Sequence, residues 1–344
     1  MASAETATRM NDMMMKAVWV RVPGGPDALE ATELPVPVPG PREVLVKAHA
    51  IGAGGPDVLI RNGTYKWMPP LPAVPGNEMA GVVAAVGEGV TNLAVGQRVL
   101  VSSRELPERG GCYAQYIRVP SDAPFALPES IAFNDAVSLG NFQLAQAMLQ
   151  GCGGSEPAKS ILVPGAAGGV ATALVQIARH HGMQVIGTAS TEEKRAYALA
   201  NGVSVLVDGR ASELPQQVMA QTGGRGVDLA FDHVGGELFM ACIRSLAPFG
   251  TAVSYNIASG PPAGDVFMAL RALLSRSLAV RTFSIHTFDS DRARRRGLME
   301  SAIALMAAGR IRAPRTTVMA LSDVRRAHEI LDAGTSLGKL VLAP

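Results

Sequence analysis

The sequence predicts an α/β protein in which a β-rich domain is followed by a doubly wound parallel-sheet domain. The prediction depends on the length of the chain, a change of sequence style near residue 138, and a return to strand-forming sequence at the C-terminus. A chain of 344 residues exceeds the usual size of one domain, so two domains are expected. Hydrophobic residues make up 48% of the chain and charged residues 17%, a composition that can fill two large cores.

The charge balance and the cysteines narrow the class of protein. A formal net charge of +2 gives no sign of binding to nucleic acid or to a membrane surface. The three cysteines, Cys112, Cys152 and Cys242, are far apart and form no CxxC pair. We therefore expect reduced thiols in a cytoplasmic protein, and neither disulfides nor a zinc lobe built from cysteines.

Residues 1–15 are polar and rich in methionine, and they lack the continuous apolar core of a signal peptide. We interpret them as a flexible N-terminal extension, with the fold beginning near Lys16. No later segment has the length and hydropathy expected of a membrane span.

Residues 16–137 have the pattern of a twisted, largely antiparallel β domain. Short runs of alternating apolar residues are separated by segments rich in proline and glycine. These runs are at 16–22, 43–52 and 80–87. Residues 81–99 indicate two strands on either side of a turn marked by glycine.

Residues 138–282 change style, because apolar strands now alternate with helical patterns. The strand-forming segments are at 160–165, 183–190, 203–208, 226–236, 251–256 and 278–285, and helical patterns occupy 168–182, 191–202 and 265–277. Alternation of this kind is typical of a parallel, doubly wound sheet.

The remaining segment, 283–344, is expected to return to the first domain. It contains a helix around 292–308, a strand near 315–320, a helix at 322–333 and a strand at 339–343. The last strand comes too late in the chain to extend the parallel sheet, so we assign it to the β-rich domain.

A phosphate-binding loop is the most specific motif in the sequence. The strand at 160–165 runs directly into Ala166-x-Gly168-x-x-Ala171, a GxGxxG fingerprint with alanine at both ends. Gly168 would let the backbone approach a pyrophosphate, and the small Ala171 would let the following helix pack close to the strand.

The helix after this loop supports the same interpretation. Gly169 and Val170 begin the helix, whose N-terminus offers unpaired N–H groups and a positive dipole end to phosphates. Small residues at a helix start can also serve packing alone. The strand before, the helix after and a second strand at the required spacing favour a dinucleotide-binding, or Rossmann, domain.

The end of the second strand indicates which dinucleotide is bound. An NAD-dependent enzyme usually places Asp or Glu there to hold the ribose hydroxyls, but this strand ends in GTAS (187–190), without an acid. Ser190, Lys194 and Arg210 follow, and a hydroxyl with two cations suits the 2′-phosphate of NADPH. The plain alternative is that Lys194 and Arg210 are ordinary surface residues. The missing carboxylate favours NADPH.

The order of these parts resembles the medium-chain dehydrogenase/reductase superfamily, and more narrowly its zinc-independent, zeta-crystallin-like quinone oxidoreductase branch. The resemblance covers the chain from Lys16 to the end, and it implies a GroES-like catalytic domain over 16–137 and 283–344 and a Rossmann NADP(H)-binding domain over 138–282. It is carried by RNGTY (61–65), PGNEMAGVVAAVGEGV (75–90), VGQRV (95–99), GCYAQYIRVP (111–120), GAAGGVA (165–171), GTASTEEK (187–194), TGGRGVDLAFDHVGG (222–236) and LGKLVL (337–342).

Two positions set this chain apart from the zinc alcohol dehydrogenases of the superfamily. Those enzymes carry GHE and an upstream cysteine, whereas this chain has Asn77 before Glu78, and Gly54 at the cysteine position. Residues 100–112 also lack the cysteine cluster of the structural zinc lobe. Without these soft ligands we expect no metal site. Glu78 is then expected to be a structural group whose charge is held by a nearby cation or by N–H groups.

Chemistry without zinc favours acceptors that are already poor in electrons. Quinones and α,β-unsaturated carbonyls fit, because the negative charge formed on reduction is delocalised onto oxygen. The protein would need to orient the nicotinamide and place a proton donor near that oxygen. The resemblance implies a cleft position for Tyr65, which is our candidate for the donor. The alternative is a tyrosine packed at a domain edge, with water as the donor.

The resemblance implies further cofactor contacts. Asn141 would lie near the nicotinamide, and Phe283 would flank it. The others are Val234, after the fourth strand of the nucleotide domain, Tyr255 and Asn256, after the fifth strand, and Lys339, in the returning segment.

Four residues depart from the pattern of the quinone reductases. They are Gly54, Leu59, Leu144 and Gly209, at positions where the family typically has asparagine, tyrosine, threonine and tyrosine. A roomier, less polar cleft keeps an enoyl-thioester or alkenal reductase open as an alternative. A non-catalytic NADPH-binding sensor or RNA-binding protein is the alternative from a different class.

Two segments bear on partners. The strand LAVRTF (278–283) has an apolar edge suited to pairing with a second copy, and the resemblance implies a homodimer. In the run at 289–297, basic residues alternate with acidic residues and alanine, as on the solvated start of a surface helix. We therefore expect a small-molecule quinone or enone substrate and a homodimer, and neither membrane nor nucleic-acid binding.

Overall fold

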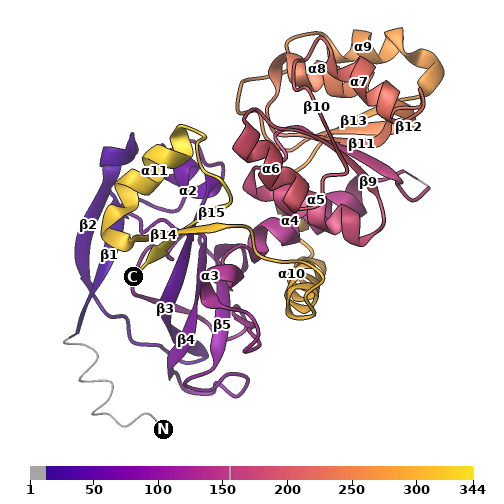
Figure 1. The fold of residues 1–344 in the computed structure, drawn as a ribbon. Coiled ribbons are helices and arrows are strands. Elements are labelled where there is room, and N and C mark those ends of the chain that lie inside the picture. The colour runs from indigo at the N-terminus through magenta and orange to yellow at the C-terminus, as the bar shows by residue number, and fades with distance from the viewer. Residues whose placement is uncertain (1–12, 155) are drawn as a thin grey trace. The chain divides into compact units, whose positions relative to one another are not determined.

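The computed structural model describes residues 13–154 and 156–344, which form two compact units (Figure 1). Among the described residues, one unit combines 13–140 with Ile303–Pro344, and the other is Asn141–Ala302. Each unit has its own sheet.

The expected N-terminal extension falls mostly on residues 1–12, which lie outside the described residues. Within the rest of it, strand β1 (Met14–Val20) starts earlier than the predicted beginning of the fold at Lys16. The reason is packing, because the buried Met15 joins a hydrophobic cluster with Val36 and Leu45.

The first unit contains a seven-stranded sheet and a two-stranded sheet. The large sheet has the order β14-β15-β3-β4-β5-β7, with β6 also pairing with β3, and the small sheet pairs β1 with β2. The other strands are β2 (Leu29–Pro35), β3 (Glu43–Ala53), β4 (Glu78–Val86), β5 (Arg98–Ser102), β6 (Tyr116–Pro120), β7 (Phe125–Ala126), β14 (Thr316–Ala320) and β15 (Lys339–Ala343). The helical segments are η1 (Pro26–Ala28), α2 (Gly55–Arg61), η2 (Ser103–Glu105), α3 (Phe133–Ala136), η5 (Leu321–Asp323) and α11 (Val324–Asp332).

The strand pairings join distant parts of the sequence in this unit. β4 pairs antiparallel with both β3 and β5. The first strand predicted within 81–99 is β4, and the second begins at Arg98 and extends past the predicted range to Ser102. β15 pairs antiparallel with β3 and parallel with β14. The C-terminal strand therefore belongs to the β-rich unit, as the sequence indicated. Its buried Leu340 and Leu342 pack in one core with Val46, Ile51 and Met79.

The second unit is built on a six-stranded parallel sheet with the order β10-β9-β8-β11-β12-β13. The strands are β8 (Ser160–Val163), β9 (Gln184–Thr188), β10 (Val205–Val207), β11 (Val227–Asp232), β12 (Leu246–Ser254) and β13 (Ala279–Thr282). The helical segments are α4 (Leu139–Cys152), which begins in the first unit, α5 (Gly169–His180), α6 (Glu192–Ala200), α7 (Leu214–Gln221), α8 (Gly236–Arg244), α9 (Val266–Ala272), η3 (Leu274–Arg276), η4 (Ile285–Phe288) and α10 (Arg292–Ala307), which ends in the first unit.

This strand order is the doubly wound arrangement that the sequence predicts. The chain runs outward from β8 to β10, crosses back, and runs outward again through β11, β12 and β13. The carboxyl ends of β8 and β11 therefore flank the point where the winding direction reverses. Ligands of open parallel sheets bind at this position.

The second unit continues to Ala302, whereas the sequence placed the domain boundary after residue 282. Apolar packing explains the difference, because Ile285, Phe288 and Leu298 form one hydrophobic cluster with Ala147 of α4. The segment that follows β13 is therefore held on the nucleotide unit before the chain returns to the β-rich unit.

Two features of the described residues bear on partners. No helix among them is both long enough and apolar enough to cross a membrane. In the basic run, Arg295 is buried and pairs with Asp289 over 2.9 Å, while the Arg294 guanidinium lies over the Phe288 ring at 5.0 Å. Two arginines of the run therefore make contacts within the protein.

Candidate active site

The phosphate loop lies between β8 and α5 and is tied to the end of β9. The Gly165 N–H donates to Thr188 Oγ1 over 3.1 Å, and the Ala166 N–H donates to the Thr188 carbonyl over 2.8 Å. Gly165 has φ +60°, a conformation that favours glycine. Ala166 and Ala171 are both buried and close the packing of loop and helix. The loop backbone is therefore fixed on the sheet before α5 begins.

At Gly168 neither the backbone conformation nor the packing of the fold requires a glycine, so the space beside it is open. Its φ of −70° suits any residue, and a Cβ placed on it would meet nothing closer than the Gly165 carbonyl at 3.5 Å. As the N-cap of α5 it has no side chain to cap the helix, so the N–H groups of Gly169 and Val170 face the loop without an intrahelical partner. This arrangement fits the pyrophosphate of a dinucleotide.

The tip of β9 carries the first residues predicted to hold a 2′-phosphate. Thr191 caps α6 by accepting from the Lys194 N–H over 3.2 Å. Ser190 and Lys194 therefore lie on the turn and the first helical turn directly after β9. Because β9 is the neighbour of β8, which leads into the phosphate loop, Ser190 and Lys194 lie at the strand end next to that loop.

Arg210, after β10, is already paired with carboxylates. It donates to Asp208 over 3.0 Å and to Glu213 over 2.8 Å, and its side chain is exposed. Surface pairs of this kind contribute little stability, so a phosphate can compete for the guanidinium. Hydrogen bonds from Arg210, together with the charge of Arg195 on α6, lower the pKa of Asp208. Arg195 is thus a further cation at this position, and sequence reasoning missed it.

The positions that carry metal ligands in the zinc enzymes are filled by a hydrogen-bonded group of side chains. Asn77 Nδ2 donates to Asp57 Oδ1 over 2.6 Å, and Asn77 Oδ1 accepts from Ser103 Oγ over 2.5 Å. Gly54 has no side chain, and its N–H donates to Asp57 Oδ2 over 2.9 Å while its carbonyl accepts from the Asp57 N–H over 3.1 Å. The described residues contain no group of three or more histidine, cysteine, aspartate or glutamate side chains that could hold a metal ion. An amide and a backbone N–H in place of imidazole and thiolate do not fit Zn²⁺.

Glu78 is held by Lys339, which supplies the cation expected from the sequence. Lys339 Nζ lies 2.6 Å from Glu78 Oε2, and both side chains are largely buried. The backbone closes around the carboxylate, because a Cβ on Gly140 would lie 1.9 Å from Glu78 Oε1 and one on Gly52 2.8 Å from Oε2. Lys339, which we expected at the cofactor, thus has its ammonium on Glu78, so any cofactor contact would be additional to this pair.

Asp57 is a buried carboxyl beside this ion pair. Burial raises its pKa to about 6, although the hydrogen bond from Asn77 and the charge of Lys339 oppose the shift. Asp57 stands three residues after Gly54, a spacing typical of helix capping. That spacing is the signal by which sequence reasoning, which missed Asp57, could have found it.

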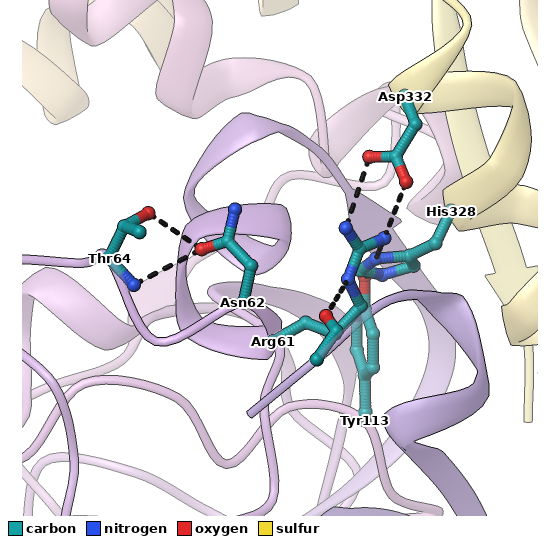
Figure 2. Close-up of polar contacts among 7 residues, drawn as sticks. Arg61, Asn62, Thr64, Tyr113, His328 and Asp332 are labelled. Carbon is teal, nitrogen blue, oxygen red and sulfur yellow. Dashed lines mark hydrogen bonds and ion pairs between the residues drawn. The ribbon is translucent and has the colours of Figure 1, made fainter. Parts of the chain in front are cut away.

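The RNGTY motif begins with a buried arginine clamp between α2 and α11, shown in Figure 2. Arg61 donates to both carboxylate oxygens of Asp332, over 3.0 and 3.2 Å, and its Nε donates to the Gly24 carbonyl over 3.2 Å. Arg61 NH1 also lies 3.4 Å from Nδ1 of His328, whose Nε2 is 3.0 Å from Tyr113 Oη. Burial and the Arg61 charge lower the pKa of His328 to about 4, so this imidazole is neutral at pH 7.

The turn after Arg61 leads to Tyr65. Asn62 Oδ1 accepts from the Thr64 N–H over 3.1 Å and from Thr64 Oγ1 over 2.6 Å (Figure 2). Gly63 at the centre has φ +75°. Tyr65 is half-buried, with its ring 5.7 Å from that of Trp67. The motif therefore holds the backbone on which Tyr65 stands, while its role as a proton donor is a proposal.

The remaining predicted cofactor residues belong to the same unit as the phosphate loop. Asn141 lies in the first turn of α4. Val234 follows β11, Tyr255 and Asn256 follow β12, and Phe283 follows β13. The structure thus gathers these last four at the carboxyl ends of neighbouring strands. His233 directly precedes Val234 and was left unassigned by sequence reasoning. Its place directly after a parallel strand was a signal for a ligand position.

Comparisons with known proteins agree with this geometry. The family model described as alcohol dehydrogenase GroES-like domain matches residues 40–129, and the one described as zinc-binding dehydrogenase matches residues 169–308. The synaptic vesicle membrane protein VAT-1 homolog of Homo sapiens is 31% identical over 338 residues, covering 93% of this chain and 84% of that protein. Quinone oxidoreductase of Salmonella typhimurium is 32% identical over 328 residues, covering 93% and 97%. The solved structure of Escherichia coli quinone oxidoreductase complexed with NADPH has a TM-score of 0.82 at 28% identity, covering 96% of this chain and all of that one.

The fold, the phosphate loop and these matches define the class of protein. The chain is a member of the medium-chain dehydrogenase/reductase superfamily. Within that superfamily it belongs to the quinone oxidoreductase branch, which confirms the resemblance seen in the sequence.

Proposed function

We propose that this protein is a zinc-free, NADPH-dependent oxidoreductase that transfers hydride to quinones or other α,β-unsaturated carbonyl compounds. The observation that carries the proposal is the filled metal position, where Asn77 bonds Asp57 and Ser103 and where Lys339 pairs with Glu78. A relative over nearly its full length is named quinone oxidoreductase, and a structural relative is complexed with NADPH.

The chemistry follows from what these residues can supply. NADPH, when bound, provides the hydride. The phosphate loop would hold its pyrophosphate through Gly168 and the N–H groups that open α5. Without a Lewis acid, the acceptor must itself spread the negative charge formed on reduction, as quinones and enones do. Tyr65 is our candidate to donate a proton to the resulting oxyanion, since a phenol O–H can act as a general acid.

The preference for NADPH is supported by the ends of β9 and β10. The tip of β9 (Thr188, Ala189 and Ser190) carries no carboxylate to hold ribose hydroxyls. Ser190, Lys194, Arg195 and Arg210 provide a hydroxyl and three cations nearby. This set suits the 2′-phosphate.

We also infer a homodimer in the cytoplasm. β13 is the last strand of its sheet, and its Ala279, Arg281 and Thr282 are exposed. The nearby α9 exposes Phe267 and Met268, which supports burial of this edge against a second copy. The three cysteines are all free and buried, which suits a reducing compartment.

The experiment that tests the function is NADPH oxidation by the purified protein with a panel of quinones, enones and enoyl thioesters, with NADH measured in parallel. The proposal predicts turnover with at least one quinone or enone and a higher kcat/KM with NADPH. Tight NADPH binding without turnover on any acceptor would remove the enzyme assignment. A preference for NADH would show that the cations after β9 and β10 do not bind a 2′-phosphate.

A further inference from the structure

His233 lies against the phosphate loop at the point where the winding of the parallel sheet reverses. It directly follows β11, while Gly165 follows the neighbouring strand β8. A Cβ placed on Gly165 would be 2.8 Å from His233 Cε1 and 3.3 Å from Nε2. The edge of the imidazole therefore fills the space that a side chain on the loop would take, and it bridges the carboxyl ends of the two strands.

Tyr255, directly after β12, contacts Nδ1 of this ring. Its Oη is 3.3 Å from His233 Nδ1, and the two ring centroids are 5.7 Å apart. Burial raises the pKa of Tyr255 and lowers the pKa of His233, so a neutral phenol faces a neutral imidazole at pH 7. A phenol that donates to Nδ1 leaves the imidazole proton on Nε2.

The backbone around His233 is fixed by bonds between the loops after β11 and β12. The Tyr255 N–H donates to the Asp232 carbonyl over 3.0 Å, and the Ala258 N–H donates to the His233 carbonyl over 3.0 Å. The buried Asp232 carboxylate accepts from the Gly235 N–H over 2.7 Å. The imidazole is thus held in place before any ligand arrives, as a binding group requires.

The sheet order indicates which part of the cofactor His233 can reach. The residues suited to the adenosine 2′-phosphate follow β9 and β10, on one side of the phosphate loop. His233 and Tyr255 follow β11 and β12, on the opposite side of the loop. A dinucleotide lies across the switch point with its pyrophosphate at the loop, so its nicotinamide half falls on the His233 side. Among the described residues, Nε2 of His233 has no hydrogen-bond partner.

We propose that His233 is a cofactor-binding residue that donates from Nε2–H to an oxygen of the nicotinamide-side phosphate or ribose of NADPH. Tyr255 is the positioning residue that keeps the proton on Nε2. The inference depends on the proposed NADPH cofactor and adds a residue-level contact to it.

The test compares two ligands on the full chain: NADPH, and adenosine 2′,5′-bisphosphate, which lacks the nicotinamide half. Dissociation constants are measured by calorimetry for the wild type and His233→Ala. We expect about a tenfold weaker affinity for NADPH in the variant, the size of one hydrogen bond to a charged group. The affinity for adenosine 2′,5′-bisphosphate should stay within about twofold, which also shows that the nucleotide unit is folded.

Two conservative variants separate the hydrogen bond from packing. The amide nitrogen of His233→Gln can take the place of Nε2, whereas that of His233→Asn falls near Nδ1. We expect the glutamine variant to recover most of the NADPH affinity and the asparagine variant to behave like alanine. Tyr255→Phe should weaken the affinity for NADPH by about twofold to threefold and leave that for adenosine 2′,5′-bisphosphate unchanged, because the tautomer of His233 is no longer fixed.

Either of two results would overturn the inference: unchanged NADPH affinity in His233→Ala, or an equal loss for both ligands. A wild-type protein that binds adenosine 2′,5′-bisphosphate but not NADPH, or neither ligand, would instead count against the cofactor assignment itself. The two failures are therefore distinguishable.

Discussion

At the scale of single residues, Lys339 and Glu78 show how the fold accommodates a buried charge directly beside Asn77. Their side chains are 7% and 13% exposed, and they are 261 positions apart in sequence. Replacing Lys339 would leave an unpaired carboxylate in the interior, which is far more costly than losing the pair as a whole.

Lys339→Met is therefore expected to destabilise the protein by about 3 kcal/mol or more. In the double variant Lys339→Met/Glu78→Gln, the charge is removed as well, so part of the loss should be recovered. The free energy of unfolding in urea measures both. Additive effects of the two substitutions would contradict the ion pair, because coupled neighbours give non-additive losses.

Asp57 gives a prediction about pH. Its pKa is raised from 3.8 to about 6, so the folded protein holds this proton more tightly than the unfolded chain. The contribution of protonated Asp57 to stability is present below pH 3.8, and it is lost as the pH rises through about 6. We expect the thermal midpoint of the wild type to fall relative to that of Asp57→Asn over this range. Parallel pH profiles for the two proteins would show that Asp57 titrates normally.

At the scale of elements, the Arg61–Asp332 clamp ties α2 to α11 beside the turn that carries Tyr65 (Figure 2). Lysine cannot reproduce the two parallel N–H bonds or the bond to the Gly24 carbonyl, so Arg61→Lys should cost about 2 kcal/mol of stability. The matched control is Arg326→Lys on α11, whose pair with Glu329 is exposed and should change stability by less than about 0.5 kcal/mol. Equal effects in urea unfolding would argue that the clamp is no stronger than a surface pair.

Two glycines of the phosphate loop should respond differently to alanine. Gly168→Ala fits the chain, so stability should change by less than about 0.5 kcal/mol while the NADPH dissociation constant rises about tenfold or more. Gly165 has φ +60°, and a Cβ on it would lie 2.8 Å from His233 Cε1. Gly165→Ala should therefore destabilise the protein by about 1 to 2 kcal/mol. Calorimetric titration and urea unfolding measure the two effects. Unchanged NADPH affinity in Gly168→Ala would contradict the phosphate-loop assignment.

At the scale of the whole molecule, the sequence predicted what local patterns encode. Alternating strand and helix segments predicted the parallel sheet, and one motif of six residues beginning at Ala166 predicted the phosphate loop. The late position of the C-terminal strand in the chain predicted that it belongs to the β-rich unit. The contacts of Arg61 with Asp332 and of Glu78 with Lys339 could not be predicted in the same way, since no local pattern links residues so far apart in sequence.

The same reason explains why the compact nucleotide unit extends beyond residue 282. The segment up to Ala302 stays with the nucleotide unit because Ile285 and Leu298 pack on α4, which lies far earlier in the chain. His233 was overlooked because its neighbours, Gly165 and Tyr255, come from two other strands. Strand order alone brings the three together.

The proposed reaction is hydride transfer from NADPH without a metal ion. Its most direct test is a single-turnover reaction of the chelator-treated protein, with metal content measured, using NADPH deuterated at the transferring position and an enone acceptor. We expect one deuterium on carbon in the product and an undiminished rate in metal-free protein. Loss of transfer on chelation, restored by added zinc, would contradict it.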